Sequence, residues 1–172
     1  MPLPMEPTAI RDALVNPDPA VALAVSLVAF HALMTSQVQH IKLTDIIDGR
    51  LRMPDGRFIP LAKPVLVHLA AWLDHRAKRW SETKNPYLLV TIQTAPRLSP
   101  PSRNFPWKKA GVTAQALRAD RILYEVEQTG GDVRRICDLF GIGIETALRY
   151  SATILEPPSP FEPPIPTAPS HP

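Results

Sequence analysis

The sequence has a single cysteine, Cys137, among its 172 residues, so no disulfide can form within the chain. This absence fits a reducing compartment, because stable disulfides occur mainly in oxidising ones. The neighbours of Cys137 read V-R-R-I-C-D-L-F, and this spacing predicts a buried structural thiol on a helix face.

Long apolar runs are also scarce, and residues 20–34 form the longest. That run is shorter than the roughly 20 residues that span a bilayer. Acidic residues precede it (Glu6, Asp12 and Asp18), where a signal peptide has basic ones. We therefore expect a buried helix in a cytoplasmic protein that has no membrane partner.

The sequence lacks a phosphate-cradling glycine loop and a set of cysteines and histidines at metal-binding spacing. Its five histidines are scattered. His68 and His75 share a helix face, but a zinc pair needs closer spacing or further ligands. We predict no metal site and no cofactor.

The excess of positive charge is small, with 19 Lys and Arg against 16 Asp and Glu. This balance permits nucleic-acid binding without demanding it. Proline is abundant, with 21 residues that gather at both ends and around 95–107. The pattern predicts a loose N-terminal segment at 1–17 with one helical turn at 8–14, a domain at 18–155, and an extended, disordered proline-rich tail at 156–172.

Within 18–155 the apolar periodicity is mostly helical, and the fold class is mainly α with a small β-hairpin or sheet (α+β). Asp18 caps a helix that runs to about 34, and Thr35 or Ser36 caps the next. Strands at 50–53 and 57–60 flank Pro54-Asp55-Gly56, a strong hairpin signal. We expect the other elements to be a helix at 63–80, a strand or extended segment at 86–91, a short helix at 100–109, and helices from Thr113 to Gly130, from Asp132 to Gly141, and across 144–150.

The last third supports two physical interpretations. Residues 131–151 read as helix, glycine turn and helix, and such a pair can enter a major groove with Glu145, Thr146 and Arg149 facing outward. The other interpretation is phosphoryl transfer at a DNA phosphodiester. This chemistry needs a nucleophile, and cations that hold the non-bridging oxygens. Tyr150, Arg118 and the hairpin arginines are the candidates for these roles.

The order of short motifs resembles the catalytic domain of the tyrosine recombinases, the phage-integrase-like family. The resemblance covers residues 20–155. Its motifs are "LMTSQVQHIKLTDI", the hairpin strand "RFIPL", "PYLLV", "VTAQALRADRI", "GGDVRRICDLFGIG" and "ALRY". It implies a DNA partner, and either a second copy of this chain or a partner recombinase.

The resemblance also assigns positions to catalytic groups. Arg118 falls on a catalytic arginine and Tyr150 on the nucleophile, which forms a 3′-phosphotyrosyl link in the family. Met34, Gln115 and Ile142 stand where the family has an arginine and two histidines or similar groups, and the hairpin turn has no lysine. Since methionine offers no hydrogen bond to a phosphoryl oxygen, we expect weak or absent recombinase activity.

Three functions remain open: a catalytically degenerate recombinase-like domain that binds DNA, an active site-specific recombinase, and a helical domain for protein contacts alone. For the first, the basic residues expected to contact DNA besides Arg118 are Arg50, Arg52, Arg57, Arg97, Arg103, Lys108, Lys109, Arg134, Arg135 and Arg149. The family usually places a DNA-clamping domain before the catalytic one. The resemblance therefore implies either a fragment or a lost clamp.

Overall fold

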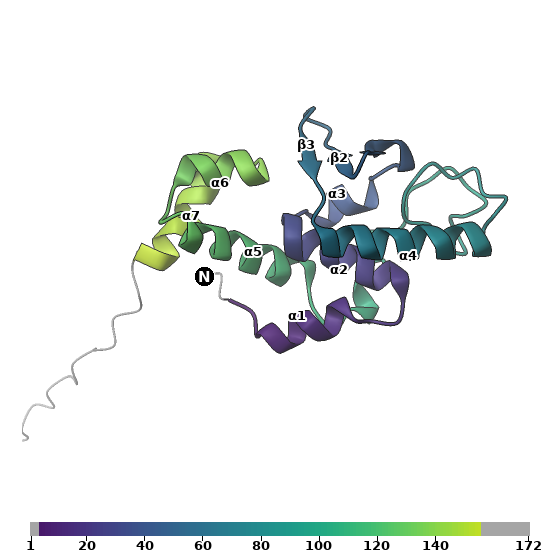
Figure 1. The fold of residues 1–172 in the computed structure, drawn as a ribbon, viewed down its shortest axis with the longest axis horizontal. Coiled ribbons are helices and arrows are strands. Elements are labelled where there is room, and N and C mark those ends of the chain that lie inside the picture. The colour runs from purple at the N-terminus through teal and green to yellow at the C-terminus, as the bar shows by residue number, and fades with distance from the viewer. Residues whose placement is uncertain (1–3, 156–172) are drawn as a thin grey trace, which may run out of the picture.

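The computed structural model describes residues 4–155, so the predicted tail at 156–172 lies outside the described residues. The elements in chain order are α1 (Pro7–Leu14), α2 (Pro19–His31), α3 (Thr35–Gln39), η1 (Leu43–Asp45), β1 (Ile46–Ile47), β2 (Arg50–Arg52), β3 (Phe58–Pro60), α4 (Lys63–Arg79), η2 (Trp107–Lys109), α5 (Ala114–Gln128), α6 (Val133–Phe140) and α7 (Ile144–Leu155). The expected class, mainly α with a small sheet, is confirmed (Figure 1).

Helix α2 is the centre of the main core. Asp18 caps it as predicted, since its Oδ1 accepts a hydrogen bond from the Ala20 N–H at 3.0 Å, and Pro19 occupies the first turn. Residues 20–28 are all buried, as a helix that is apolar on every side requires. Helices α1, α4 and α5 pack around it. The helix ends at His31 rather than near 34, because Ala32 takes a left-handed conformation with φ of 53°.

Helix α4, predicted at 63–80, buries a stripe of Val65, Leu69 and Trp72 and packs on α2. Arg76 extends this stripe and is also buried, which the sequence pattern did not indicate. Its Nη2 donates hydrogen bonds to the carbonyls of Asn85 and Tyr87 at 2.7 and 3.0 Å. The segment that follows α4 is therefore fixed beside the helix as an extended chain.

The sheet contains three antiparallel strands in the order β1-β2-β3. The expected hairpin forms β2 and β3, with Leu51 opposite Ile59 and Gly56 in the turn at φ of 87°. Strand β1 was not predicted, because two residues are too few to show a period. The 86–91 segment is extended rather than a strand, and makes one isolated bridge from Tyr87 to Lys42.

The N-terminal segment is more ordered than the predicted loose one. Helix α1 packs on α2 through buried Ala13 and half-buried Ile10 and Leu14. The Met5 N–H also donates to Asp120 Oδ1 on α5 at 2.8 Å. The apolar positions of this short helix therefore outweigh its surrounding prolines.

A second, smaller core joins α5, α6 and α7, and Figure 1 shows α6 and α7 stacked at one end of α5, away from α4. Thr113, Asp132 and Gly141 cap these helices as predicted. The second core contains buried Ala32, Ile122, Val126, Ile136 and Ala147. Cys137 was predicted to be buried, but it is only half-buried at the edge of this cluster, because a short helix pair leaves its rim open.

Candidate functional site

A pocket of about 340 Å³ lies between the α2–α3 junction and the first turns of α5. Its lining residues are Leu33, Met34, Thr35, Ser36, Arg103, Ala114, Gln115 and Arg118. The lining contains two guanidinium groups, two hydroxyls and an amide. It includes no carboxylate among the described residues, so the pocket is positively charged.

The α2–α3 junction takes its shape from the left-handed Ala32, which turns the chain sharply at the end of α2. Met34 then starts α3, and its N–H donates to Gln37 Oε1 at 2.9 Å. The Met34 side chain is 45% exposed and lines the pocket. It therefore occupies the site, not the core.

Arg118 enters the pocket from the second turn of α5. Its Nε donates to the Ala32 carbonyl at 2.9 Å, which fixes the plane of the guanidinium. Among the described residues its Nη1 and Nη2 groups have no hydrogen-bond partner. Gln115 lies one turn earlier on α5 and lines the same pocket. The structure thus brings Met34 to the same pocket as Gln115 and Arg118, which come much later in the sequence.

Tyr150 and Ile142 do not line this pocket. Both are half-buried and pack against the second core, among the apolar side chains of α5, α6 and α7. Ser151, the residue next to Tyr150, is buried. The two residues that the motif order linked to Arg118 therefore lie outside its pocket.

No protein-family model matches the sequence, and no curated protein matches it either. Solved structures do match. The chain superimposes on XerA recombinase with a TM-score of 0.69 and 22% identity, over 88% of this chain and 60% of XerA. It also superimposes on the XerH site-specific recombinase bound to its difH substrate, with a TM-score of 0.66 and 14% identity, over 88% of this chain and 50% of XerH.

The chain has the fold of the tyrosine recombinases. It spans 60% and 50% of the lengths of these two recombinases, so it corresponds to part of each. In this recombinase fold, the pocket with Arg118 is formed by residues that the sequence motifs singled out.

Arg103 is the unexpected member of the pocket, because it comes from the irregular segment between α4 and α5. Gln39 Nε2 on α3 donates to the Pro101 carbonyl at 3.3 Å and holds this segment against α3. On the other side, Phe105 and Trp107 pack against the main core. These anchors hold the Arg103 backbone beside the pocket. An irregular segment has no periodicity from which this placement could be predicted.

The other candidate DNA-contacting residues are spread over the surface of the recombinase fold. Some have acidic neighbours: Arg52 Nη2 lies 3.3 Å from Asp45 Oδ1, and Lys109 Nζ lies 3.8 Å from Asp18 Oδ2. The exposed residues with no ion pair within the described part of the chain are Arg50, Arg97, Arg103, Lys108, Arg134, Arg135 and Arg149. Exposed ion pairs are weak, so the paired residues could still exchange to phosphate.

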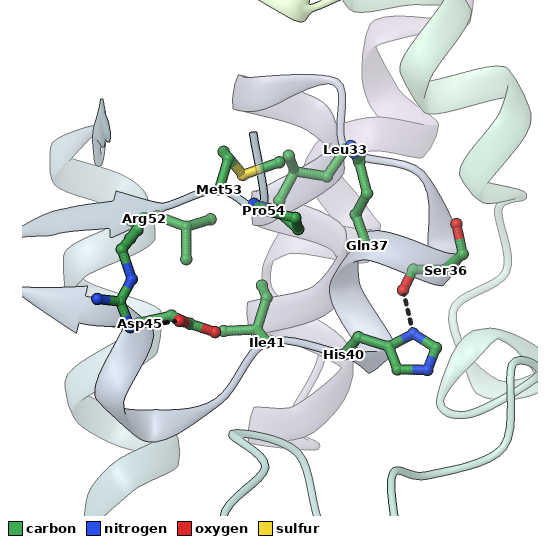
Figure 2. A pocket seen from close by; sticks show the side chains of 10 residues that line it. Leu33, Ser36, Gln37, His40, Ile41, Asp45, Arg52, Met53 and Pro54 are labelled. Atoms are coloured by element: carbon green, nitrogen blue, oxygen red, sulfur yellow. Dashed lines mark hydrogen bonds and ion pairs between the residues drawn. The ribbon is translucent and has the colours of Figure 1, made fainter. Parts of the chain in front are cut away.

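Figure 2 shows a second pocket, of about 240 Å³, where the hairpin meets α3. Leu33, Ile41 and Met53 form its apolar wall, and the Arg52–Asp45 pair lies at one side. The two pockets share Leu33 and Ser36. The hairpin therefore packs on the same short helix that forms one wall of the Arg118 pocket.

Arg57 connects the hairpin to the α6–α7 turn. Its Nε donates to Asp55 Oδ2 at 2.6 Å and its Nη1 to the Asp138 carbonyl at 3.4 Å, one of the free carbonyls at the end of α6. Its backbone and side-chain hydrogen bonds lower the pKa of Asp55. The guanidinium lies against Gly141, where a Cβ would overlap Arg57 Nη2.

We expect Gly141→Ala to lower the free energy of unfolding by about 1–2 kcal/mol. Alanine is strained at φ of 61°, and its Cβ would displace Arg57. Gly143→Ala is the matched control, because that position has no positive φ and no atom within 4 Å of an added Cβ. Denaturant unfolding of both variants measures the difference. Equal stabilities would contradict this prediction.

Among the described residues, no three His, Cys, Asp or Glu side chains gather as a metal site would require. Likewise, no helix within residues 4–155 is long and apolar enough to cross a membrane.

Proposed function

We propose that this chain is a DNA-binding domain of the tyrosine recombinase type, with degenerate catalytic chemistry. The observation that carries the proposal is the pocket in which Arg118 presents free Nη groups and no carboxylate among the described residues competes for them. A guanidinium in this state forms charge-assisted, bidentate hydrogen bonds with a phosphodiester. The fold, shared with a recombinase bound to its difH substrate, supports DNA as the source of that phosphate.

The same pocket supports the proposed loss of catalytic chemistry. Met34 lines the same pocket as Arg118 and offers no donor to a phosphoryl oxygen. Loss of one preorganised donor costs roughly 2.7–4 kcal/mol, or 100–1000-fold in rate. Gln115 can donate a hydrogen bond, but its amide cannot take or give a proton at neutral pH. Among the described residues, the pocket lining therefore offers no general base to a tyrosine nucleophile. We infer slow or absent strand cleavage at Tyr150.

The exposed basic residues would extend the contact beyond the pocket. The exposed residues Arg50, Arg97, Lys108 and Arg149 lie on β2, on the irregular segment, on η2 and on α7, respectively. A second copy of this chain, or a partner recombinase, would supply the rest of a grip around the duplex.

We expect the protein to bind generic duplex DNA in about 50 mM salt and to lose affinity steeply as salt rises, because phosphate contacts release counterions. Arg118→Ala should weaken binding about tenfold, a loss near that of one charge-assisted contact. The affinity of Arg118→Lys should lie between those of wild type and Arg118→Ala, because lysine retains the charge but cannot bind in a bidentate way. Fluorescence anisotropy across a salt series measures all three proteins.

Arg11→Ala is the control, because Arg11 is exposed on α1 and lies outside the pocket. Its affinity should stay within about twofold of wild type, as expected for a solvated surface charge. Thermal unfolding of each variant shows that the pocket change leaves the fold intact. If wild type fails to bind in about 50 mM salt, DNA binding is wrong, and the protein-contact hypothesis takes its place.

A further inference from the structure

Two arginines share the pocket, and they come from different parts of the chain. Arg118 is on α5, and Arg103 is on the irregular segment that precedes η2. Within the described residues, Arg103 has no ion pair or side-chain hydrogen bond, and the pocket lining holds no acidic group to balance the two charges. Like charges around one cavity repel each other, so the cavity favours an anion between them.

The size and donors of the pocket fit a phosphate group. Its volume of about 340 Å³ exceeds that of a phosphate and leaves room for the neighbouring sugar atoms. The hydroxyls of Thr35 and Ser36 and the amide of Gln115 add neutral donors to the two guanidinium groups. Such a set can surround the oxygens of a diester from several sides.

The position of Arg103 is held by its neighbours rather than left to a free loop. Pro101 is bound by Gln39 on α3, and Phe105 and Trp107 pack against the core. Only the side chain of Arg103 therefore has to be ordered when an anion binds, which keeps the entropy cost low.

We propose that Arg103 supplies the second phosphate-binding guanidinium of this pocket and takes the place of the arginine that is missing at Met34. The ligand is a phosphodiester of duplex DNA, so this inference rests on the proposed function. In this arrangement Arg103 and Arg118 contact the same phosphate, one from each side of the pocket.

Duplex binding provides the first test. Arg103→Ala should weaken binding about tenfold and reduce the slope of log affinity against log salt by about one, whereas Arg11→Ala should change neither. Because both arginines contact one phosphate, the double variant Arg103→Ala/Arg118→Ala should lose at least threefold less than the product of the single losses. An Arg103→Ala affinity equal to that of Arg11→Ala, or fully multiplicative losses, would overturn the shared contact while leaving DNA binding intact.

Inorganic phosphate separates this inference from the proposed function. At matched ionic strength, phosphate should raise the unfolding temperature of wild type relative to chloride, and should do so less in Arg103→Ala and in Arg118→Ala. If phosphate stabilises all the proteins equally, the two-arginine site is wrong. If phosphate acts through both arginines but wild type does not bind duplex DNA, the site holds a free phosphate or another phosphorylated ligand, and the DNA assignment fails.

Discussion

Acidification from pH 7 to pH 4 should remove about 3 kcal/mol of stability through one histidine, His31. Burial, and after it the charge of Arg121, lowers the His31 pKa from 6.5 to about 4 in the folded protein. Its Nε2 also accepts a hydrogen bond from the Ala62 N–H at 3.1 Å, which only an unprotonated nitrogen can do. The unfolded chain takes up the proton near pH 6.5. The contribution is therefore full above that pH and is lost as pH falls towards 4.

Denaturant unfolding at several pH values measures this loss against His31→Gln. Glutamine retains an acceptor for the Ala62 N–H but does not titrate. The carboxylates are the same in both proteins, so their shared acid sensitivity cancels in the difference. We expect the stability of wild type relative to His31→Gln to fall by about 3 kcal/mol over this range. Parallel pH profiles for the two proteins would contradict the prediction.

Met34→Arg should bind duplex DNA at least tenfold more tightly than wild type in low salt. The side chain at this position is 45% exposed in the pocket, so arginine can enter without disturbing the core. A charge-assisted hydrogen bond contributes about 1.5–3 kcal/mol, and 1.4 kcal/mol corresponds to tenfold. If Arg103 occupies the role of the missing arginine, Met34→Arg should also restore the affinity that Arg103→Ala loses.

Val67→Arg is the matched control. Val67 is 66% exposed on α4, so the substitution adds the same charge outside the pocket. An equal gain in Val67→Arg would show that charge alone raises the affinity.

Catalysis can be tested in the same proteins with nicked duplexes. These duplexes are first selected for binding from a random library. We expect wild type to form no covalent adduct. An adduct that disappears in Tyr150→Phe would contradict the degenerate assignment.

Much of the fold follows from short, local signals. Asp18, Thr113 and Asp132 precede helices and cap them, and the Asp-Gly turn between alternating residues produces the β2–β3 hairpin. The apolar run after Asp18 becomes the central helix because no side of it could face water. These features depend on a few neighbouring residues and are therefore readable from the sequence.

The features that were missed depend on contacts between distant residues. A helical turn at 8–14 was predicted, but its packing on α2 through Ile10, Ala13 and Leu14 was not. Arg76 is buried because two backbone carbonyls of a later segment receive its guanidinium, and an isolated arginine gives no sign of this. Strand β1 exists only as the edge partner of β2.

The candidate site also contains both kinds of feature, those readable from the sequence and those set by distant contacts. The motif order placed Met34, Gln115 and Arg118 in related positions, and the structure brings all three to one pocket. Arg103 could be named only as one basic residue among many, because its approach is set by the Gln39–Pro101 contact and not by any motif. Sequence motifs thus indicated where the proposed phosphate site lies, but not its full set of cations.

The two cores have a thermodynamic consequence. The segment that carries Arg103 packs on the large core around α2, whereas Tyr150 packs on the small cluster of α5, α6 and α7. Arg118 lies between the two, since it follows Leu117 of the large core and its Nε bonds to the carbonyl of Ala32 in the small cluster. A small cluster opens at a lower free energy than the whole domain. Such a sub-global opening would move Tyr150 while the backbone beside Arg103 stayed anchored on the large core. Binding at the proposed phosphate site and the position of the tyrosine would then be partly independent equilibria, so that one could change without the other.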